Sequence, residues 1–452
     1  MDANEFKERL KEAAAGFGFE SWEIYFGRDE SFQVKVHEGE IQQYKNSKPL
    51  GLSFRGVYKG RMGYSFTELL DEESILPLLS NAAANSQIVE SDDVERLYEG
   101  GDDYEEVKAY DPQLNEASVS EKIEWALAME RVALDEDSRV KATDYCAVGS
   151  GEGEVAIANS YGLNLSHKFN YMYAFIQVRV EENGVSKNGF ETWHGRDFKA
   201  FSPEDLAKKA VSKGLSYLNA SSVPSQAMPV LFDPETAGNL FSAFASVFYA
   251  ERAQKGFSLL RGRQGQTIAS ELVTIHDDGA CQQSLGSVPF DSEGVACRKK
   301  VIVNKGKLNT LLYNQKSAAK DGVKSTGNGF KRSYAGSIDT SITNFYMEPS
   351  NEPIQAEKFQ KILLVKELMG LHSGANPVTG DFSLLVVNGF LLENGKISKP
   401  VEQITVAGNF YDLIMNIIAV GNDLRFDMPG ASGAVGMPSV LVKELKISGE
   451  VQ

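Results

Sequence analysis

Few side chains in this sequence have the chemistry to bind a metal ion or transfer a proton, and histidine is the clearest of them. The chain has five histidines, which are His37, His167, His194, His276 and His372. A helical zinc site places two histidines one turn apart, so that both rings reach the same ion. No two histidines stand that close together in this sequence. The residue pattern therefore predicts no metal ligand, no bound cofactor and no catalytic residue in this chain.

The segment 370–381 is the strongest candidate for a functional loop. It reads Gly-Leu-His-Ser-Gly-Ala-Asn-Pro-Val-Thr-Gly-Asp and precedes the apolar run 382–387. Glycine, asparagine and proline occur this densely where a backbone turns tightly or approaches another group closely. We predict that this segment contacts a substrate or another subunit. The residues predicted to make that contact are Gly370, His372, Ser373, Asn376, Thr379, Gly380 and Asp381. A structural turn ahead of a strand is the alternative interpretation.

Two shorter segments also combine residue types that bind ions or protons. His276 is followed by two aspartates, which together offer an imidazole and carboxylates, although a turn at the end of a strand is favoured. The glycine-rich segment 325–329 lies near Lys331 and Arg332 and has the composition of an anion-binding loop, but a turn is again favoured. Neither a P-loop nor a dinucleotide-binding glycine motif is present, so the sequence does not support nucleotide binding.

The composition narrows the class of protein. The chain has 452 residues, of which 42% are hydrophobic and 24% charged, as in a soluble globular protein of more than one domain. Its formal net charge of −16 disfavours binding to nucleic acid or to an anionic membrane surface. The three cysteines form no C-x-x-C pair, which favours reduced thiols. The first residues lack the apolar core of a signal peptide, so we expect a cytoplasmic protein.

Hydrophobic periodicity predicts an α+β fold, because helical and strand patterns are interleaved without a regular β-α-β rhythm. In the first half, predicted helices cover 4–16, 72–85, 119–135 and 203–218. The third helix begins with the capping-box pattern Ser118-x-x-Glu121. Alternation over 140–192 predicts successive strands, with a turn at the glycines of 149–153.

The second half is predicted to be rich in strands. Helices are expected only at 234–254, 358–367 and 411–420. Residues 219–229 contain alanine, serine and proline in the manner of a linker. We therefore predict an N-terminal domain at 1–220 with a mixed sheet and helices. A linker at 221–229 would join it to a strand-rich C-terminal domain at 230–452, with an antiparallel or mixed sheet.

An ordered set of segments in the C-terminal half resembles the PmbA/TldD family, historically called modulators of DNA gyrase. These segments are Gly265-Gln266, Ala269-Ser270-Glu271, Asp277-Asp278-Gly279, Phe290-Asp291-Ser292-Glu293-Gly294, 325–329, 370–383, Glu393-Asn394-Gly395-Lys396 and Ala407-Gly408-Asn409-Phe410. The resemblance implies a cytoplasmic zinc metallopeptidase system built from two related subunits. The N-terminal half fits the family in size and pattern but has weaker signatures.

The resemblance also implies where zinc would be bound. The TldD-type subunit carries H-E-x-x-x-H on a helix early in the C-terminal domain and a cysteine ligand near the C-terminus. The corresponding turn here is 241–246, which reads Phe-Ser-Ala-Phe-Ala-Ser, and Ser432 stands at the place of the cysteine. Without these groups zinc has no ligand set and water has no activating base. The chain is thus similar to the PmbA (TldE) type, the partner that lacks its own zinc site.

The resemblance implies partners as well as a function. We expect a subunit of a peptidase system that degrades or trims unstructured peptides, with zinc held by a TldD-type partner subunit. Extended peptides would bind by strand addition, and a homodimer is the alternative assembly in the absence of that partner. Two other functions remain open. One is a peptidase acting alone through His372 with Asp381 or through His276 with Asp277, and the other is a binding protein acting on another target such as DNA gyrase.

Overall fold

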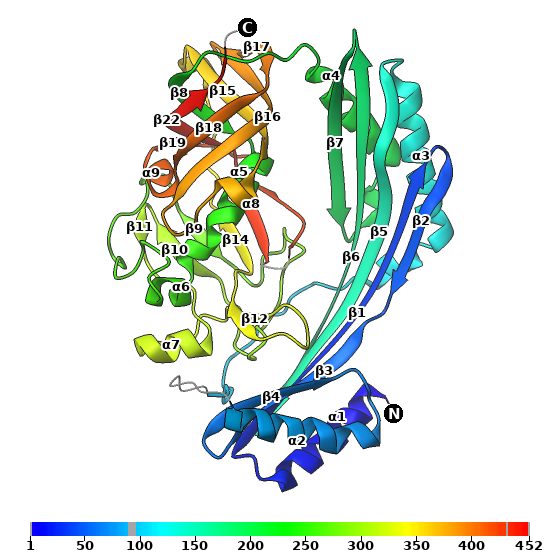
Figure 1. The fold of residues 1–452 in the computed structure, drawn as a ribbon, viewed down its shortest axis with the longest axis vertical. Coiled ribbons are helices and arrows are strands. Elements are labelled where there is room, and N and C mark those ends of the chain that lie inside the picture. The colour runs from blue at the N-terminus through cyan, green and yellow to red at the C-terminus, as the bar shows by residue number, and fades with distance from the viewer. Residues whose placement is uncertain (1, 89–95, 431–432, 451–452) are drawn as a thin grey trace.

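The computed structural model describes residues 2–88, 96–430 and 433–450, and it confirms the α+β class (Figure 1). The first half of the chain forms one long, curved sheet with helices. Its elements are α1 (Ala3–Phe17), β1 (Ser21–His37), β2 (Glu40–Ser47), β3 (Leu50–Tyr58), β4 (Arg61–Thr67), α2 (Glu72–Ile88), η1 (Pro112–Glu116), α3 (Val119–Glu136), β5 (Val140–Asn159), β6 (Asn164–Glu182), β7 (Val185–Gly195), η2 (Phe198–Ala200) and α4 (Pro203–Ser216). The four helices predicted here are confirmed, and the Ser118–Glu121 capping box is formed.

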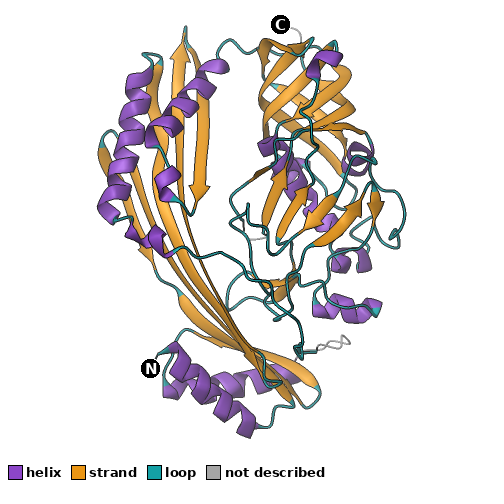
Figure 2. Cartoon of the chain, turned by 180° about the vertical axis from the view of Figure 1, so that it is seen from behind, coloured by secondary structure: helices purple, strands orange, loops and turns teal. Residues whose placement is uncertain are grey.

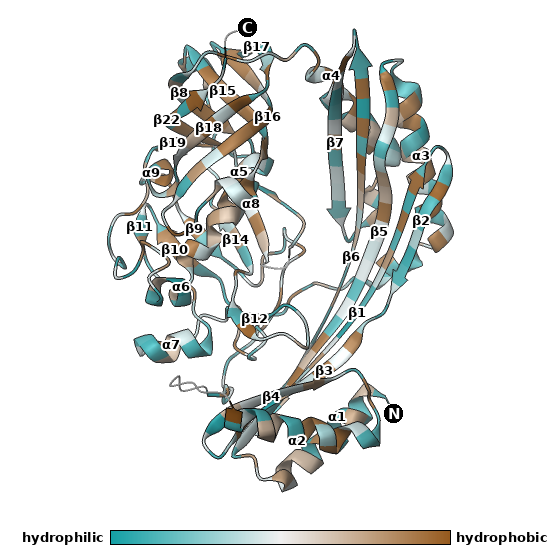
Figure 3. Cartoon of the chain, viewed as in Figure 1, coloured by the Kyte–Doolittle hydropathy of each residue, from teal (hydrophilic) through white to brown (hydrophobic). Residues whose placement is uncertain are grey.

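The strands of this first sheet pair antiparallel in the order β4-β3-β1-β5-β6-β7, with β2 attached to β1. Helices α3 and α4 cover one face of the sheet at one end, and α1 and α2 lie at the other end (Figure 2). Buried and less buried residues alternate along β6, and apolar and polar segments follow one another along the same strand in Figure 3. An alternation with a period of two residues is expected for a strand whose two faces differ in burial.

The turn predicted at 149–153 is wrong, because these glycines lie in the middle of β5. Their strand partners on β6 are Tyr173, Tyr171 and Phe169, whose rings lie over the glycine backbone. A Cβ atom added at Gly151 would lie 2.4 Å from the Tyr171 ring. Glycine thus leaves room for a row of aromatic rings, and this role in a strand looks like a turn signal in the sequence.

The second half of the chain forms a separate lobe (Figure 1). Its elements are β8 (Gln226–Phe232), α5 (Pro234–Phe244), η3 (Ala245–Phe248), α6 (Ala250–Gln254), β9 (Ile275–Asp277), β10 (Lys300–Asn304), β11 (Lys307–Leu308), α7 (Gln315–Asp321), β12 (Gly329–Lys331), β13 (Ile338–Thr340), β14 (Asn344–Met347), η4 (Ala356–Lys358), β15 (Lys361–Met369), α8 (Leu371–Gly374), β16 (Asp381–Glu393), β17 (Lys396–Val401), β18 (Ile404–Asn409), α9 (Phe410–Met415), β19 (Ile417–Val420), β20 (Arg425–Phe426), β21 (Ala434–Met437) and β22 (Val440–Ser448). None of the described helices is long and apolar enough to cross a bilayer.

Two sheets and a short ribbon organise this lobe. One sheet has the order β15-β8-β22-β18-β16-β17, and a further pairing of β15 with β16 closes it on itself. The other has the order β11-β10-β9-β14-β21-β20, and β12 pairs with β13. Both sheets contain one parallel pairing among antiparallel ones, as the prediction of an antiparallel or mixed sheet allows. The main apolar core lies between these sheets and α5.

All three helices predicted in this lobe are wrong in whole or in part. The segment 358–367 forms β15, whose Ile362, Leu363 and Val365 are fully buried between neighbouring strands. Pairing on both sides outweighs the helical preference of the local sequence. The segment 411–420 divides into α9 and β19.

The long helix predicted at 234–254 is interrupted after Phe244, where η3 and α6 replace it. A backbone contact causes the interruption. Leu312 donates its N–H to the Phe248 carbonyl at 2.9 Å, and Ala250 donates its N–H to the Leu312 carbonyl at the same distance. A continuous helix would use these backbone groups internally. The break therefore separates the helix turn 241–246 from the charged side chains of α6.

Gly189 on β7 allows a close approach of α4, and we expect Gly189→Ala to destabilise the protein. An added Cβ atom would lie 2.0 Å from the Ala210 carbonyl oxygen, so helix and strand must separate. Overpacking of this kind costs about 1–3 kcal/mol of unfolding free energy. Denaturant unfolding measures the loss. The matched control is Gly16→Ala on α1, where the added Cβ has no neighbour within 4 Å and stability should hold or rise slightly. Equal stability of both variants would contradict this packing.

Candidate functional site

The predicted contact segment, residues 370–381, forms a closed loop at the start of β16. Gly370 adopts a left-handed backbone, with φ of 94°, and begins the short helix α8. Asn376 donates its N–H to the Asp381 carbonyl at 2.8 Å, and its side chain accepts from the Val378 N–H at 2.9 Å. Asn409 on β18 donates to the Asp381 carboxylate at 2.9 Å. Asn376 and Asp381 therefore shape the loop itself.

Two glycines of this loop allow close contacts that a side chain would prevent. A Cβ atom at Gly374 would lie 2.3 Å from the Ser383 carbonyl oxygen. A Cβ atom at Gly380, whose φ is 85°, would lie 2.5 Å from the Tyr411 ring. Tyr411 in turn accepts the Leu259 N–H at its hydroxyl oxygen, at 3.2 Å. The glycines are thus explained by packing, and a contact of this loop with a substrate or subunit stays a prediction.

His372 and Ser373 are the exposed residues of α8. Within the described part of the chain, the His372 ring has no hydrogen bond and no ion pair. The hydrogen bonds from Asn409 and then Thr379 lower the pKa of Asp381, and no contact joins this carboxylate to His372. The structure therefore does not bring together the pair that a peptidase acting alone would use.

His276 and Asp277 are also directed to different partners. They are neighbours on β9, and successive side chains of a strand point to opposite faces. The His276 Nε2 atom lies 3.2 Å from the Glu348 carboxylate. Asp277 is fully buried and accepts hydrogen bonds from Lys300 and Asn328, each at 2.9 Å. The predicted His276–Asp277 pair is thus not formed.

The segment 325–329 bends at Gly327, whose φ of 70° is left-handed as predicted, but its second glycine, Gly329, begins β12. It also supplies Asn328, which links buried groups. The Asn328 amide donates to Asp277 and to the Ser341 carbonyl at 2.8 Å, and its oxygen accepts from Lys300 at 3.1 Å. Buried polar groups are stable when each has such a partner. The segment therefore has a structural role that its composition did not reveal.

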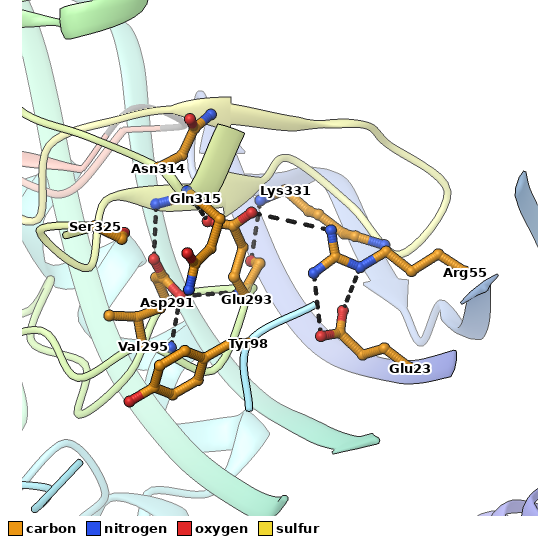
Figure 4. A network of polar contacts seen from close by, with 12 residues as sticks. Glu23, Arg55, Tyr98, Asp291, Glu293, Val295, Asn314, Gln315, Ser325 and Lys331 are labelled. Atoms are coloured by element: carbon orange, nitrogen blue, oxygen red, sulfur yellow. Dashed lines mark hydrogen bonds and ion pairs between the residues drawn. The ribbon is translucent and has the colours of Figure 1, made fainter. Parts of the chain in front are cut away.

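A second buried network joins the two lobes (Figure 4). Arg55 on β3 lies between Glu23 on β1 and Glu293 of the second lobe (Figure 4). Its Nε and Nη2 atoms donate to both oxygens of Glu23, at 2.7 and 3.1 Å, and its Nη1 atom lies 3.9 Å from Glu293. All three side chains are buried. The contact between lobes therefore places the charged Arg55 group beside Glu293 at a position that water does not reach.

Two carboxyl groups of this network have raised pKa values. The N–H groups of Gly329, Glu293 and Val295 donate hydrogen bonds to Asp291 at 2.8 to 3.0 Å. Burial raises the pKa of Asp291 by more than these hydrogen bonds lower it, so the net shift is upward. Burial, and then the charge of Asp291, raise the pKa of Glu293. Lys331 donates to the Ser53 hydroxyl at 2.6 Å, and burial lowers its pKa to about 7. Each shift disfavours the charged form.

The helix turn 241–246 has one buried side and one side that faces a cavity. Phe241 and Phe244 are buried, with ring centroids 5.3 and 4.6 Å from that of Phe410. Ser242 and Ser246 line a cavity of about 680 Å³. The turn therefore presents small residues to the cavity and apolar rings to the core.

The cavity lies between α5, α6, the segment after β12 and the segment around residue 430. The residues that line it are Asn239, Ser242, Ala243, Ala245, Ser246, Tyr249, Glu251, Arg252, Lys255, Phe257, Arg332, Asp339, Thr340, Ile342, Asp427, Met428, Gly430, Gly433 and Val435. A neighbouring cavity of about 540 Å³ shares Arg332, Ile342, Met428, Gly430 and Gly433 with it. This second cavity also has Phe169 and Tyr171 of β6 in its wall, so the pair of cavities reaches the first lobe.

Both signs of charge are present in the first cavity. Lys255 pairs with Glu251 at 2.6 Å. Burial, followed by the charge of Glu235, raises the pKa of Asp427 to about 7. Gly238 makes room for this aspartate, because an added Cβ would lie 2.7 Å from its carboxylate.

The residues of this cavity do not fit a zinc ion. Zinc sites in proteins use three or four histidine, cysteine, aspartate or glutamate ligands. Within the described residues, no three such side chains are close enough to hold a metal ion. The turn 241–246 supplies hydroxyl and apolar groups in place of imidazole and carboxylate. Ser432, which stands at the place of the family's cysteine, lies outside the described residues.

Sequence reasoning missed most charged residues of the cavity and of the lobe contact. Arg252, Arg332 and Asp427 belong to segments far apart in the chain, and no local pattern joins them. Asp291 and Glu293 were noticed only as part of a family signature. Asp291 and Glu293 are two residues apart on an irregular segment, and this spacing alone does not indicate a chemical role. What identifies them is burial, which only the structure provides.

Comparisons with known proteins give consistent results over the chain. The PmbA/TldA metallopeptidase domain 1 model matches residues 22–86, the central domain model 112–218 and the C-terminal domain model 225–449. A metalloprotease PmbA homologue of Haemophilus influenzae is 29% identical, covering 93% of this chain and 90% of the relative. Metalloprotease PmbA of Escherichia coli is 28% identical, with coverage of 95% and 92%. A metalloprotease TldD homologue of Haemophilus influenzae is 27% identical, with coverage of 94% and 92%.

Solved structures are also similar to this chain. A protein of Thermotoga maritima named as a modulator of a DNA gyrase has a TM-score of 0.90 and 29% identity, and the match covers 99% of this chain and 100% of that one. TldE of Thermococcus kodakarensis has a TM-score of 0.90 and 24% identity, with coverage of 98% and 100%. At this lower identity the second similarity speaks for the fold alone.

Proposed function

Because this chain belongs to the PmbA/TldD metallopeptidase family and is of the PmbA/TldE type, we propose that it is the peptide-binding subunit of a cytoplasmic zinc peptidase. In this proposal a related TldD-type subunit holds the zinc ion and performs hydrolysis. The present chain binds unstructured peptides and completes the site in which they are cut.

The observation that carries this proposal is the helix turn 241–246. The family resemblance places the zinc-binding motif of the catalytic subunit at this turn. In the present chain, Phe241 and Phe244 of the turn lie in the apolar core beside Phe410. In H-E-x-x-x-H the histidines would stand at positions 241 and 246 and the glutamate at position 242. This chain has the buried Phe241 and the cavity-lining Ser246 and Ser242 at these places. A cavity with small residues remains at this place, which favours binding over hydrolysis.

This chain's residues suggest how a peptide would be held. The backbone at Gly430 and Gly433 is already paired, because each donates its N–H to the other's carbonyl, at 3.0 and 3.2 Å. Among the described strands, β7 is the last of its sheet and offers an edge to which an extended peptide would add. Main-chain hydrogen bonds give affinity with little preference for sequence, as degradation of unstructured peptides requires. The exposed aromatic rings of Phe257 and, on β7, Phe190 offer apolar contact.

Co-purification with a TldD-type subunit of the same organism tests the proposal. We expect the two chains to elute together, the isolated chain to contain no stoichiometric zinc, and an unstructured peptide to be cleaved faster by the pair than by either chain. Turnover and stoichiometric zinc in the isolated chain, both lost in His372→Ala, would favour a peptidase acting alone. Failure of the two chains to associate would contradict the proposal.

A further inference from the structure

Two arginines reach the first cavity from different elements. Arg252 belongs to α6, and Arg332 follows β12. Among the residues that the structure describes, neither side chain has an ion-pair or hydrogen-bond partner. The Arg252 Nε atom is buried without an acceptor. A buried donor without an acceptor costs free energy, so oxygen atoms placed in this cavity would be bound favourably.

The other charged groups of the cavity leave these arginines available. The third cation, Lys255, has Glu251 as its partner at 2.6 Å. Burial raises the pKa of Asp427 to about 7, which reduces the negative charge of this carboxyl near neutral pH. Asp339 and Arg332 are both exposed, so water screens both charges, whereas Arg252 is partly buried. An anionic group would therefore meet the two guanidinium groups without strong competition.

Apolar groups lie beside the same arginines. The guanidinium carbon of Arg252 lies 5.5 Å from the centre of the Phe257 ring, which is 45% exposed. Ala243, Ile342 and Met428 also line the cavity. A carboxylate joined to an apolar side chain has both features that this surface would recognise. The last residue of a peptide with an apolar C-terminus is such a group.

We propose that this cavity binds the C-terminal end of a peptide, with the α-carboxylate on Arg252 and Arg332 and an apolar last side chain against Phe257. The inference rests on the proposed peptide-binding function and adds the end of the peptide that is recognised. Arginine suits this role because its planar group offers paired donors that match the two oxygens of a carboxylate. Binding of the free end would also fix the direction in which the peptide enters the site.

Binding of labelled peptides to the isolated full-length chain, followed by fluorescence anisotropy, tests this inference. One peptide is unstructured, has no acidic side chain and ends in leucine with a free carboxylate. The second has the same sequence with an amidated C-terminus, and the third is amidated but carries a glutamate near its end. We expect the free peptide to bind about tenfold more tightly than either amidated peptide, as loss of a charge-assisted hydrogen bond implies.

Variants assign this preference to the arginines. Arg252→Gln and Arg332→Gln should each reduce the preference for the free carboxylate, and the double variant should abolish it. Arg61→Gln, at an exposed strand end outside the cavity, is the matched control and should keep it. Thermal unfolding of each variant confirms that it is folded. The amidated peptides should bind equally well to all variants, because they do not use the arginines.

Three outcomes would overturn the inference. Equal binding of the free and amidated peptides means that the carboxylate is not recognised. Tight binding of the amidated peptide with glutamate means that a side-chain carboxylate is the ligand, and a preference that persists in the double variant means that another site binds it. In each case peptide cleavage by the two-subunit complex can still occur, which separates this failure from that of the proposed function. Absence of peptide binding together with absence of cleavage would refute both.

Discussion

Replacing Arg55 by methionine is expected to lower the free energy of unfolding by about 3–5 kcal/mol, because it leaves the buried Glu23 carboxylate without its cation. Glu23 is 1% exposed and Glu293 is 3% exposed, so water cannot replace the guanidinium group. The change also removes the contact of Arg55 with Glu293, which joins the first sheet to the second lobe. Unfolding in denaturant, followed by tryptophan fluorescence, measures the loss.

A double variant distinguishes the loss of attraction from the cost of an unpaired charge. Glu23→Gln together with Arg55→Met removes the cation and its bidentate partner at once. Buried ion pairs replaced as a pair often cost little, so the double variant should recover much of the stability. Arg61→Met, at an exposed position on β4, is the matched control and should unfold as the unchanged protein does. A loss below about 1 kcal/mol for Arg55→Met would show that the pair behaves as an exposed one.

Replacing Glu293 by glutamine is expected to change how stability depends on pH. Burial raises the pKa of Glu293 above the ordinary glutamate value of 4.5, so the folded protein holds a proton that the unfolded chain has released. The contribution of protonated Glu293 to the free energy of unfolding is fully present below pH 4.5. It is lost as the pH rises from there through the raised pKa of the folded protein. The loss amounts to about 1.4 kcal/mol for each pH unit crossed in that window. Glutamine does not titrate, so the variant should gain stability relative to the unchanged protein between pH 5 and 7.

This window avoids the opposite effect of Lys331. Burial lowers its pKa to about 7, so the folded protein has released a proton that the unfolded chain keeps. Stability from this group therefore rises with pH above about 7, whereas below that pH its effect on stability changes little with pH. Denaturation midpoints at pH 5, 6 and 7 measure the difference, and Glu12→Gln at an exposed position of α1 is the control. Parallel pH profiles for Glu293→Gln and the unchanged protein would contradict a protonated Glu293.

Helices with an amphipathic pattern and strong end signals could be predicted from the sequence. The third helix began at Ser118 as its capping box indicated, because that signal is complete within four residues. The failures came where distant segments decide the structure. Residues 358–367 became a strand because β8 and β16 lie on both sides of it, and Gly151 lies under an aromatic ring of a partner strand. No local pattern contains these neighbours.

The candidate site was less accessible to prediction than the fold. The loop 370–381 was found by its composition, yet most of its signal comes from residues such as Asn376 and Gly380 that shape the backbone. Arg252 gave no signal in the sequence, because its importance depends on burial and on a shared cavity. Arg332 stood out only as a cation beside the glycine-rich segment 325–329, and the sequence does not show that it shares a cavity with Arg252. The domain boundaries at 220 and 230, the partner subunit and the homodimer stay predictions. The family could be recognised from the sequence because its glycine-rich and polar segments occur here in the expected order. This order is visible even where the chemical role of each residue is not.

The pairing of β1 with β5 has a consequence for how this protein can be divided. It runs from Glu23 opposite Asn159 to Lys35 opposite Ala147. The family's first segment supplies one of these strands and its second segment supplies the other. A fragment ending near residue 100 would expose an unpaired strand edge, which promotes aggregation. Expression of either segment alone would therefore leave a strand of this pair without its partner, although family models describe the two segments as separate domains.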